Sequence, residues 1–462
     1  MSELLEAIDR VILSYNEYVG GYLVLIALIP TGLFFTIKFK FLQITKLGHA
    51  FKIITGVYDR KEDEGEINHF KSLNTALSAT IGTGNIVGVS LAIYFGGPGA
   101  MFWMWVTGIL GMMIKLVECT LSLQFRNVNE DGSISGGPMY YMEKGLKKYG
   151  KISKIMAVIF AFATILCSFG TGNIAQSNSM SDVFFSNYGV PHWVTGIVIS
   201  TLVLLVIVGG IKRIARISAS LVPAMSILYF VSGLLIIILY FTEIPYAFAL
   251  IFSGAFNGTA ASGGFIGSAF ILTIRYGVAR GLFSNEAGQG SAPIAHSAAK
   301  TKFAAQEGLV ASTGPFIDTL IICSLTAFVI ILTGAWKSGI QGVSMTVEGF
   351  SIGLQKIGLE FLGQHIVAVG LLLFAFSTMI SWSYYGDRAT EYLFGRRYII
   401  TYRYVYGLFA FLGAIWGIDL VWHFVDMVIT FMTIPNLIAI LFLTPIAKKE
   451  IKKYLEHIKT IK

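Results

Sequence analysis

Charged residues are scarce in this sequence. Of the 462 residues, only 13% are Asp, Glu, Lys or Arg, whereas 55% are hydrophobic. A soluble protein of this length needs far more charge on its surface, so the composition excludes an ordinary soluble globular protein. The hydrophobic residues gather in continuous runs of about 17 to 25, the length of helix that crosses a bilayer, rather than in the alternating pattern of a β-barrel. We therefore predict an all-α polytopic membrane protein.

Cysteine and histidine are also sparse. The three cysteines, Cys119, Cys167 and Cys323, each lie inside an apolar run, which predicts buried small side chains and no disulfide framework. The seven histidines are scattered without close spacing, so no metal-ligand cluster is expected. No base is evident beside Ser284 or Ser291. An intramembrane enzyme is therefore the weaker alternative, and we predict that the protein is not an enzyme.

Positive charge is confined to short segments between the apolar runs, six of which hold 28 of the 34 Lys and Arg residues. These segments are 38–71, 126–154, 212–216, 300–302, 388–403 and 448–462. Short basic loops collect on the cytoplasmic side of a membrane, whereas a nucleic-acid partner needs one continuous basic face. We predict a multi-pass protein of the cell membrane that contacts lipids and binds no nucleic acid. Its C-terminus is expected in the cytoplasm. Its acidic N-terminus, which lacks the positive start of a signal peptide, is expected outside.

Eleven apolar runs are long enough to be transmembrane helices. They are 18–37, 73–95, 99–125, 153–179, 191–209, 217–241, 264–296, 306–333, 362–391, 400–417 and 421–446. No low-complexity linker divides them, so residues 1–462 are expected to form one membrane transport domain. Its predicted parts are an additional N-terminal helix (18–37), two five-helix repeats (70–241 and 262–446) and a basic cytoplasmic tail (447–462).

The two repeats are expected to be inverted copies of each other. A shift of about 203 residues brings a glycine-rich interruption at 82–88 over one at 285–291 and matches the surrounding hydropathy. Five spans separate the two copies, so the second copy starts on the opposite side of the membrane. Paired interruptions in inverted repeats are typical of transporters, whose site lies between them. Chance similarity between glycine-rich membrane segments is the alternative.

The first interruption, GTGNIVG, places flexible and polar residues in the middle of an apolar run. Gly82, Gly84 and Gly88 weaken a helix there, and Asn85 is polar. Gly84 and Gly88 also form the G-x-x-x-G pattern of close helix packing, which is the structural alternative. If the helix unwinds at this point, its free amides suit a carboxylate and its free carbonyls suit Na⁺ or an ammonium group.

Charge lies inside several predicted spans. The second interruption, 275–293, contains Arg280 and Glu286, which are costly near the midplane unless each faces a partner or water. Two interpretations stay open: an Arg280–Glu286 ion pair that holds the break, or a gate or coupling element. Asp318 and Asp426 also lie in spans, each either as a paired structural charge or as a relay.

Hydroxyl and amide side chains recur in two further spans. Asn173 and Gln176 are three residues apart and are expected on one helical face. Ser377 and Thr378 are adjacent hydroxyls that suit one cation, or that bond back to their own helix.

Three motifs resemble signatures of the alanine or glycine:cation symporter family. They are GTGNIVG, GGPGAMFWMW (96–105) and RGLFSNEAGQGSAP (280–293). The likeness extends from about residue 18 to residue 446. The family is similar in fold to the LeuT-type transporters, which implies two inverted five-helix repeats with two broken helices, here preceded by one additional helix. Its members carry alanine and glycine with Na⁺, and some with H⁺.

The resemblance implies two ion sites. Ser377 and Thr378 resemble the hydroxyl pair of one sodium site of that fold. The residues implied for this Na⁺ site are Ser78, Ile81, Phe374, Ser377 and Thr378. Asn85 resembles a ligand of a second ion site, but Gly314 and Pro315 are expected where that fold has another Asn.

The resemblance also implies a substrate pocket at the first interruption. The amides of Thr83 and Gly84 would meet the substrate carboxylate, and the carbonyls of Thr80 and Phe283 its ammonium group. Trp382 would be the wall that keeps the pocket small. The full set of expected substrate-binding residues is Thr80, Gly82, Thr83, Gly84, Asn173, Gln176, Phe283, Ser284, Gly288 and Trp382.

The residues themselves predict a carrier of a small zwitterion with a cation. The resemblance implies a symporter that takes up a small neutral amino acid, alanine or glycine, with Na⁺ by alternating access. No cofactor is expected besides the transported Na⁺. The alternative is the same carrier coupled to H⁺. A channel would share the helix breaks, but the inverted repeat favours a carrier.

Overall fold

The computed structural model describes residues 2–60, 62–130, 132–257, 266–416 and 418–461. The helices are α1 (Ser2–Tyr15), α2 (Gly21–Lys38), α3 (Leu42–Thr45), α4 (Leu47–Ile54), α5 (His69–Thr80), α6 (Val89–Gly96), α7 (Ala100–Phe125), α8 (Pro138–Gly145), α9 (Lys151–Phe169), α10 (Ala175–Tyr188), α11 (His192–Ile207), α12 (Gly210–Leu239), α13 (Ile244–Asn257), α14 (Ile266–Asn285), α15 (Ala292–His296), α16 (Ala304–Pro315), α17 (Ser324–Thr333), α18 (Val343–Gln355), α19 (Phe361–Phe394), α20 (Ile399–Ile415), α21 (Ile418–Phe442) and α22 (Thr444–Ile461). Strands β1 (Asn127–Val128) and β2 (Ile134–Ser135) form one antiparallel hairpin.

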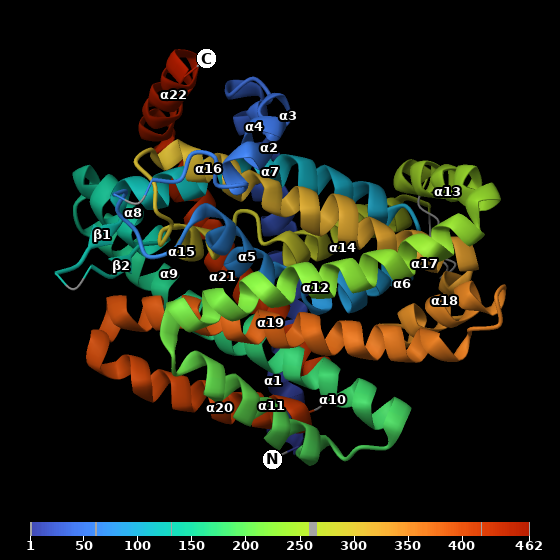
Figure 1. Ribbon diagram of the computed structural model, residues 1–462. Helices are drawn as coiled ribbons and strands as arrows, with labels where there is room; N and C mark the ends of the chain where they lie inside the picture. Colours follow the sequence, from blue (N-terminus) through green and yellow to red (C-terminus); the bar gives the residue numbers. More distant parts are fainter. Residues whose placement is uncertain (1, 61, 131, 258–265, 417, 462) are drawn as a thin grey trace.

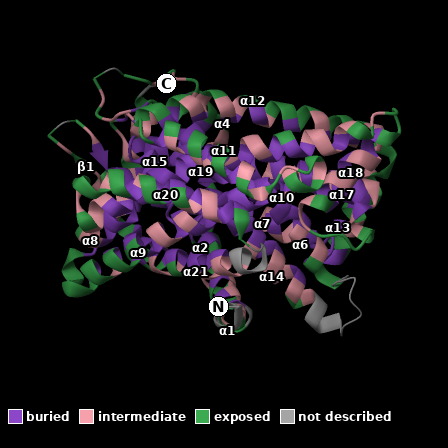
Figure 2. Ribbon diagram, turned by 90° about the horizontal axis from the view of Figure 1, so that it is seen from below, coloured by how far each residue is buried: buried purple, intermediate pink, exposed green. Residues whose placement is uncertain are grey.

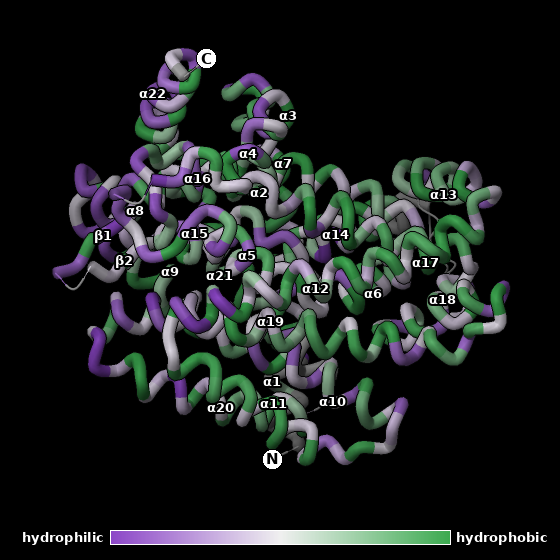
Figure 3. The backbone as a smooth tube through the Cα atoms, in the orientation of Figure 1, coloured by the Kyte–Doolittle hydropathy of each residue, from purple (hydrophilic) through white to green (hydrophobic). Residues whose placement is uncertain are grey.

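The long helices lie side by side in one bundle (Figure 1). The β1–β2 hairpin and α8 lie at one end of the bundle, called the hairpin end here, and α13 and α18 lie at the other, called the α13 end. Buried residues fill the interior (Figure 2), while hydrophobic residues cover the long helices and hydrophilic residues gather at the hairpin end and on α22 (Figure 3). This distribution is that of a helical bundle whose sides face lipid.

Eight helices among the described residues are long and apolar enough to cross a membrane, and a ninth span results if the bent pair of α5 and α6 is one span. The prediction of an all-α polytopic membrane protein is therefore confirmed. Two of the eleven predicted spans do not correspond to a helix of the described residues that is long and apolar enough to cross a membrane. The span 191–209 corresponds to α11, which has 16 residues, and the span 264–296 corresponds to α14 and α15. Positions 262–265 of the predicted second repeat lie outside the described residues, as does position 417.

The first interruption breaks the helix where it was predicted. Helix α5 ends at Thr80, Ile81 is extended, and a wide π-helical turn over Gly84–Gly88 leads into α6, so the two halves bend by 53°. A Cβ atom on Gly82 would lie 2.4 Å from the Thr378 hydroxyl oxygen. Glycine is therefore required at position 82 because α19 approaches so closely.

The second interruption is a non-helical segment between α14 and α15. Glu286, Gly288 and Gly290 have φ angles of +55°, +86° and +78°, a left-handed conformation that ends a helix. Both predicted breaks are thus present, and each exposes backbone amides and carbonyls in the middle of the bundle.

A third irregularity lies between α9 and α10, which together form the span Lys151–Tyr188. The five residues GTGNI occur both at 82–86 and at 170–174, and the second copy is a π-helical turn over Gly170–Ile174. A π turn holds more residues than an α turn, so it rotates the side chains that follow it relative to those before it.

The broken helices are held from several sides. Helix α7 packs against α14 and α16, and α19 packs against α5, α9 and α12. The additional N-terminal helix α2 packs against α7 and α21. Two shorter helices, α8 and α13, lie in the connections between the long helices.

Candidate functional site

Two serines join α5 to α19 directly beside the first break. The Ser78 hydroxyl donates to the Ser377 carbonyl at 2.7 Å, and the Ser377 hydroxyl lies 3.1 Å from the Ser78 carbonyl and 2.8 Å from that of Phe374. The Thr378 hydroxyl lies 3.4 Å from the Ile81 carbonyl. The structure therefore brings together all five residues expected to form a Na⁺ site. Hydroxyl and carbonyl oxygens of this kind are the ligands that hard cations prefer.

Two more serines extend this group along α12 and α19. The Ser218 hydroxyl lies 3.1 Å from that of Ser78 and 3.5 Å from that of Ser381. Ser381 follows Ser377 by one helical turn, which is visible in the sequence. Ser218 was not expected here, because nothing in the sequence of α12 relates it to α5.

A buried carboxylate lies on the other side of the first break. The Asp318 carboxylate accepts hydrogen bonds from the Asn85 amide at 2.6 Å, the Ser284 hydroxyl at 2.7 Å and the Thr319 hydroxyl at 2.8 Å. The Asn85 side-chain oxygen in turn accepts from the Gly82 amide at 2.9 Å. Among the described residues, no Lys, Arg or His lies within ion-pair distance of Asp318.

The expectation that Gly314 and Pro315 lie opposite Asn85 is wrong. Asp318, about one turn further along, lies there instead. Gly314 faces α7, where a Cβ atom would lie 3.6 Å from the Lys115 nitrogen. The difference arises because α16 leads into a π-helical stretch over Phe316–Cys323, which changes the face that each residue presents. The second candidate ion site thus contains an ionisable side chain rather than an amide.

Gln176 reaches the first break, but Asn173 does not. The Gln176 side-chain oxygen accepts from the Thr83 amide at 3.2 Å. Asn173 donates to the Tyr406 carbonyl of α20 at 2.7 Å. The prediction that both share one face is wrong, because Asn173 belongs to the π turn 170–174. Asn173 therefore anchors α20.

Trp382 lies between the second break and the π turn. Its indole nitrogen donates to the Glu286 carboxylate at 2.8 Å, and Ser291 donates to the other Glu286 oxygen at 2.5 Å. A Cβ atom on Gly172 would lie 2.2 Å from Trp382, so only glycine fits beside this indole. Trp382 is fully buried and held in one place, as a pocket wall must be.

The proposed Arg280–Glu286 ion pair is absent, since Glu286 bonds to Trp382 and Ser291. Arg280 instead binds Asp426 of α21 with both guanidinium nitrogens, at 3.1 and 2.7 Å. The Arg280 guanidinium also lies 6.0 Å from the centre of the Phe283 ring. This pair joins α14 to α21 on the α13 side of the second break.

The remaining expected residues divide between the two breaks. Phe283 and Ser284 pack on the first break, where a Cβ atom on Gly84 would lie 3.0 Å from the Ser284 Cα. The Thr80 hydroxyl lies 3.3 Å from the carbonyl of Leu77 in its own helix. Gly288, by contrast, does not lie at the first break. It belongs to the second break and packs against α21, where a Cβ atom on Gly288 would lie 2.9 Å from Leu437.

Two buried charges in α7 were missed. Lys115 and Glu118 are 1% and 0% exposed, and Glu118 accepts from the Asn436 amide at 2.8 Å. The sequence could have revealed them, because a Lys and a Glu inside the predicted span 99–125 each need a partner. They belong to the packing around the breaks.

The hairpin end is closed beneath the breaks. The Glu307 carboxylate accepts hydrogen bonds from His69 at the start of α5 and, at 2.6 Å, from His296 at the end of α15. Arg126 donates to the carbonyls of Ser297 and Ala299 at 2.8 and 2.7 Å. The inner halves of both broken helices are therefore tied together.

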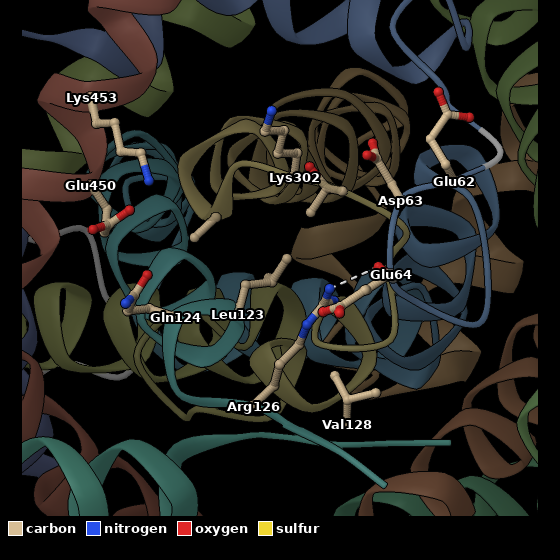
Figure 4. A pocket seen from close by; sticks show the side chains of 12 residues that line it. Glu62, Asp63, Glu64, Leu123, Gln124, Arg126, Val128, Lys302, Glu450 and Lys453 are labelled. Carbon is tan, nitrogen blue, oxygen red and sulfur yellow. Dashed lines mark hydrogen bonds between the residues drawn. The ribbon is translucent and has the colours of Figure 1, made fainter. Parts of the chain in front are cut away.

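A cavity of about 420 Å³ lies on the outer side of this closure (Figure 4). Arg126 and Glu64 lie at its floor, with Lys302 and Lys453 across from them. Arg126 donates to the Glu64 carbonyl at 2.7 Å. Arg126 therefore belongs both to the lining of this cavity and to the closure of the hairpin end.

A membrane bundle with two broken helices, whose exposed backbone meets hydroxyl groups of neighbouring helices, defines the class of secondary transporters. The chain belongs to the sodium:alanine symporter family, which it matches over residues 5–462. It is therefore a transporter and not an enzyme.

The chain is similar to named transporters over nearly its whole length. It is 43% identical to the sodium/alanine symporter AgcS of Methanococcus maripaludis, over 96% of both chains. It is 35% identical to a putative sodium/proton-dependent alanine carrier protein, YrbD, of Bacillus subtilis, over 96% of this chain and 91% of the other. In fold it is similar to a manganese transporter of Eremococcus coleocola, with a TM-score of 0.51, 13% identity and coverage of 85% and 82%.

Proposed function

We propose that this protein is a symporter that takes up a small neutral amino acid, alanine or glycine, together with Na⁺ by alternating access. The observation that carries the proposal is the oxygen group of Ser78, Ile81, Phe374, Ser377 and Thr378 at the first break. These contacts join four carbonyls and three hydroxyls, and they include no carboxylate. A monovalent cation suits such a neutral shell, because it needs little charge compensation.

The amino acid binds between the two breaks. The amides of Thr83 and Gly84 lie at the start of the half-helix that continues into α6, and a helix N-terminus favours a carboxylate. The carbonyls of Thr80 and Phe283 receive the ammonium group. Trp382 limits the volume available to the side chain.

Na⁺ and the amino acid bind cooperatively because both use the same unwound backbone. The Ile81 carbonyl faces the ion, while Thr83 and Gly84 face the substrate. An ion that orders residues 81–84 reduces the entropy lost when the amino acid binds, so each ligand raises the affinity of the other.

Coupling to H⁺ is the second candidate function. Asp318 supports it, because a buried carboxylate that accepts three hydrogen bonds, and that has no Lys, Arg or His of the described residues within ion-pair distance, is able to carry a proton or to bind a second cation. The Bacillus relative is named as a putative carrier that depends on both sodium and protons.

In this proposal the bundle consists of two inverted five-helix repeats of the LeuT type, with α1 and α2 as the additional N-terminal helix. The two breaks, one in each half of the chain, support this arrangement. The hairpin end lies in the cytoplasm because the basic segments gather there, and the N-terminus lies outside.

Uptake of labelled alanine into proteoliposomes tests the proposal. Three conditions are compared: an inward Na⁺ gradient, a pH gradient of equal driving force, and no gradient. Accumulation above equilibrium with Na⁺ alone is the expected result. Accumulation with the pH gradient alone supports H⁺ coupling instead, and equilibration without accumulation under any gradient contradicts a symporter.

A further inference from the structure

A second cavity, of about 330 Å³, lies at the hairpin end between the start of α12, the end of α19 and the start of α20. Its charged and hydroxyl lining consists of Lys212, Arg388, Arg396, Arg403, Glu66, Tyr384 and Ser133. None of these residues belongs to the site at the breaks. The lining carries four cationic side chains and one carboxylate.

All three arginines of the lining form ion pairs. Arg403 binds the Asp387 carboxylate at 2.5 Å, Arg388 binds Glu391 at 2.6 Å and Arg396 binds Glu391 at 2.8 Å. These pairs hold the guanidinium groups in place around the opening. The four cationic side chains and the three carboxylates of Glu66, Asp387 and Glu391 give this group a net charge of +1. Individual hydrogen-bond donors therefore matter more here than the overall charge.

Three donors of the lining have no acceptor among the described residues. The Tyr384 side chain is 1% exposed, and its hydroxyl has no hydrogen-bond partner. The Arg388 Nε atom has none either, and the Arg388 guanidinium lies 5.2 Å from the centre of the Tyr384 ring. Lys212 is exposed and forms no ion pair. A buried donor without an acceptor is costly, so its retention indicates a ligand that supplies the acceptor.

We propose that this cavity binds the phosphate group of an anionic ligand, with Tyr384, Arg388 and Lys212 as its donors. A phosphate oxyanion accepts hydrogen bonds from hydroxyl, guanidinium and ammonium groups, and basic pockets between transmembrane helices at the cytoplasmic surface suit lipid headgroups. The placement of the cavity in the cytoplasm rests on the orientation in the proposed function. An anionic lipid and soluble inorganic phosphate are the two sources of this group.

A phosphate bound in this cavity affects the transport site through α12 and α19. Tyr384 lies on α19, one turn beyond Ser381, and Lys212 lies at the start of α12, which carries Ser218. Glu66 accepts a hydrogen bond from Ile134 at 2.8 Å and immediately precedes α5. A phosphate held between these elements therefore stabilises the hairpin end in its closed arrangement.

The test measures ligand binding to the purified full chain in detergent, by thermal unfolding and by native mass spectrometry. The probes are dioleoyl-phosphatidylglycerol, dioleoyl-phosphatidylcholine and inorganic phosphate at constant ionic strength. The variant Tyr384→Phe/Lys212→Gln removes one unpartnered hydroxyl and one exposed charge. The control is Lys459→Gln on α22, which removes a charge from an exposed position outside this cavity.

Without ligand, the double variant is expected to unfold at or above the wild-type temperature, because the deleted hydroxyl has no partner to lose. Its affinity for phosphatidylglycerol is expected to fall about tenfold, while Lys459→Gln binds like the wild type. Protection by inorganic phosphate alone assigns the site to a soluble ligand. Equal affinity in wild type and double variant, equal protection by phosphatidylcholine, or protection by neither phosphate source overturns the proposal. Binding is measured without transport, so this result is independent of the symport assay.

Discussion

The Asn85 amide donates a 2.6 Å hydrogen bond to the Asp318 carboxylate, 233 positions further along the chain. This bond connects the first broken helix to the helix that follows the second one. Ser284, next to the second break, donates to the same carboxylate. The buried Asp318 carboxylate therefore accepts hydrogen bonds from residues beside both breaks. This position suits a residue that couples ion binding to movement of the broken helices.

Replacing this acid tests its role directly. Asp318→Asn keeps the shape and removes the charge, and we expect Na⁺-driven or H⁺-driven alanine uptake to fall by at least about tenfold, a change of about 1.4 kcal/mol. Asp182→Asn, the same substitution at a half-buried position of α10, is the control. If Asp318 carries the proton, the remaining uptake of Asp318→Asn no longer depends on a pH gradient. Uptake equal to that of the control variant contradicts a coupling role.

The serine and threonine of α19 are expected to control the response to Na⁺. Ser377→Ala/Thr378→Ala removes both hydroxyls of this pair, so Na⁺-driven uptake should be abolished while the protein still folds. Ser383→Ala is the matched control, because the Ser383 hydroxyl bonds to the Ile380 carbonyl of the same helix at 2.7 Å. Initial uptake rates against Na⁺ concentration measure the effect. An unchanged Na⁺ dependence in the double variant would remove this ion site from the mechanism.

The Arg280–Asp426 pair predicts a charge-reversal experiment. Each single reversal, Arg280→Glu or Asp426→Arg, leaves two like charges facing each other in a largely buried position, and uptake should fall at least about tenfold. The double reversal restores an ion pair and should recover a measurable part of the activity. The interaction energy from this double-mutant cycle is the readout. Additive losses with no recovery would show that the two side chains do not act together.

Substrate size is expected to depend on Trp382. Trp382→Phe removes the hydrogen bond to Glu286 and shortens the pocket wall, so larger neutral amino acids such as valine should compete better for labelled alanine uptake. Trp103→Phe provides the control, since the Trp103 indole donates to the Ala255 carbonyl at 3.1 Å, at the α13 end. An identical inhibition profile in both variants would exclude Trp382 from the pocket.

The closure of the hairpin end depends on Glu307. Glu307→Gln leaves His69 and His296 without their shared carboxylate in a fully buried position, where loss of one partner costs about 3 to 5 kcal/mol. We expect a lower unfolding temperature, or greater labelling of a cysteine introduced at Ser72, which lies 3.2 Å from His296. Glu450→Gln, at a half-buried position of α22, is the control. If both variants match the wild type in unfolding and labelling, Glu307 does not hold this end closed.

Much of the fold was predictable because it depends on local properties. Scarce charge and long apolar runs require a helical membrane bundle, since every backbone polar group must be satisfied inside the bilayer. The break at Gly82 was predictable for a similar reason, because glycine and Asn in an apolar run weaken a helix wherever it packs. The adjacent hydroxyls of Ser377 and Thr378 were also visible in the sequence.

The partners of the buried polar groups were decided by tertiary structure alone. Arg280 pairs with Asp426 and not with Glu286, and Asp318 rather than Gly314 lies opposite Asn85. Asn173 donates a hydrogen bond to α20, whereas Gln176, three residues later, accepts one from the first break. In each case the spacing along the chain was known, but π-helical turns and the packing of distant helices determine which face a side chain presents. The sequence by itself thus determined the bundle, its breaks and its family. The pairing of charges across helices was settled only by how the helices pack, because an electrostatic partner is chosen by distance in space and not along the chain.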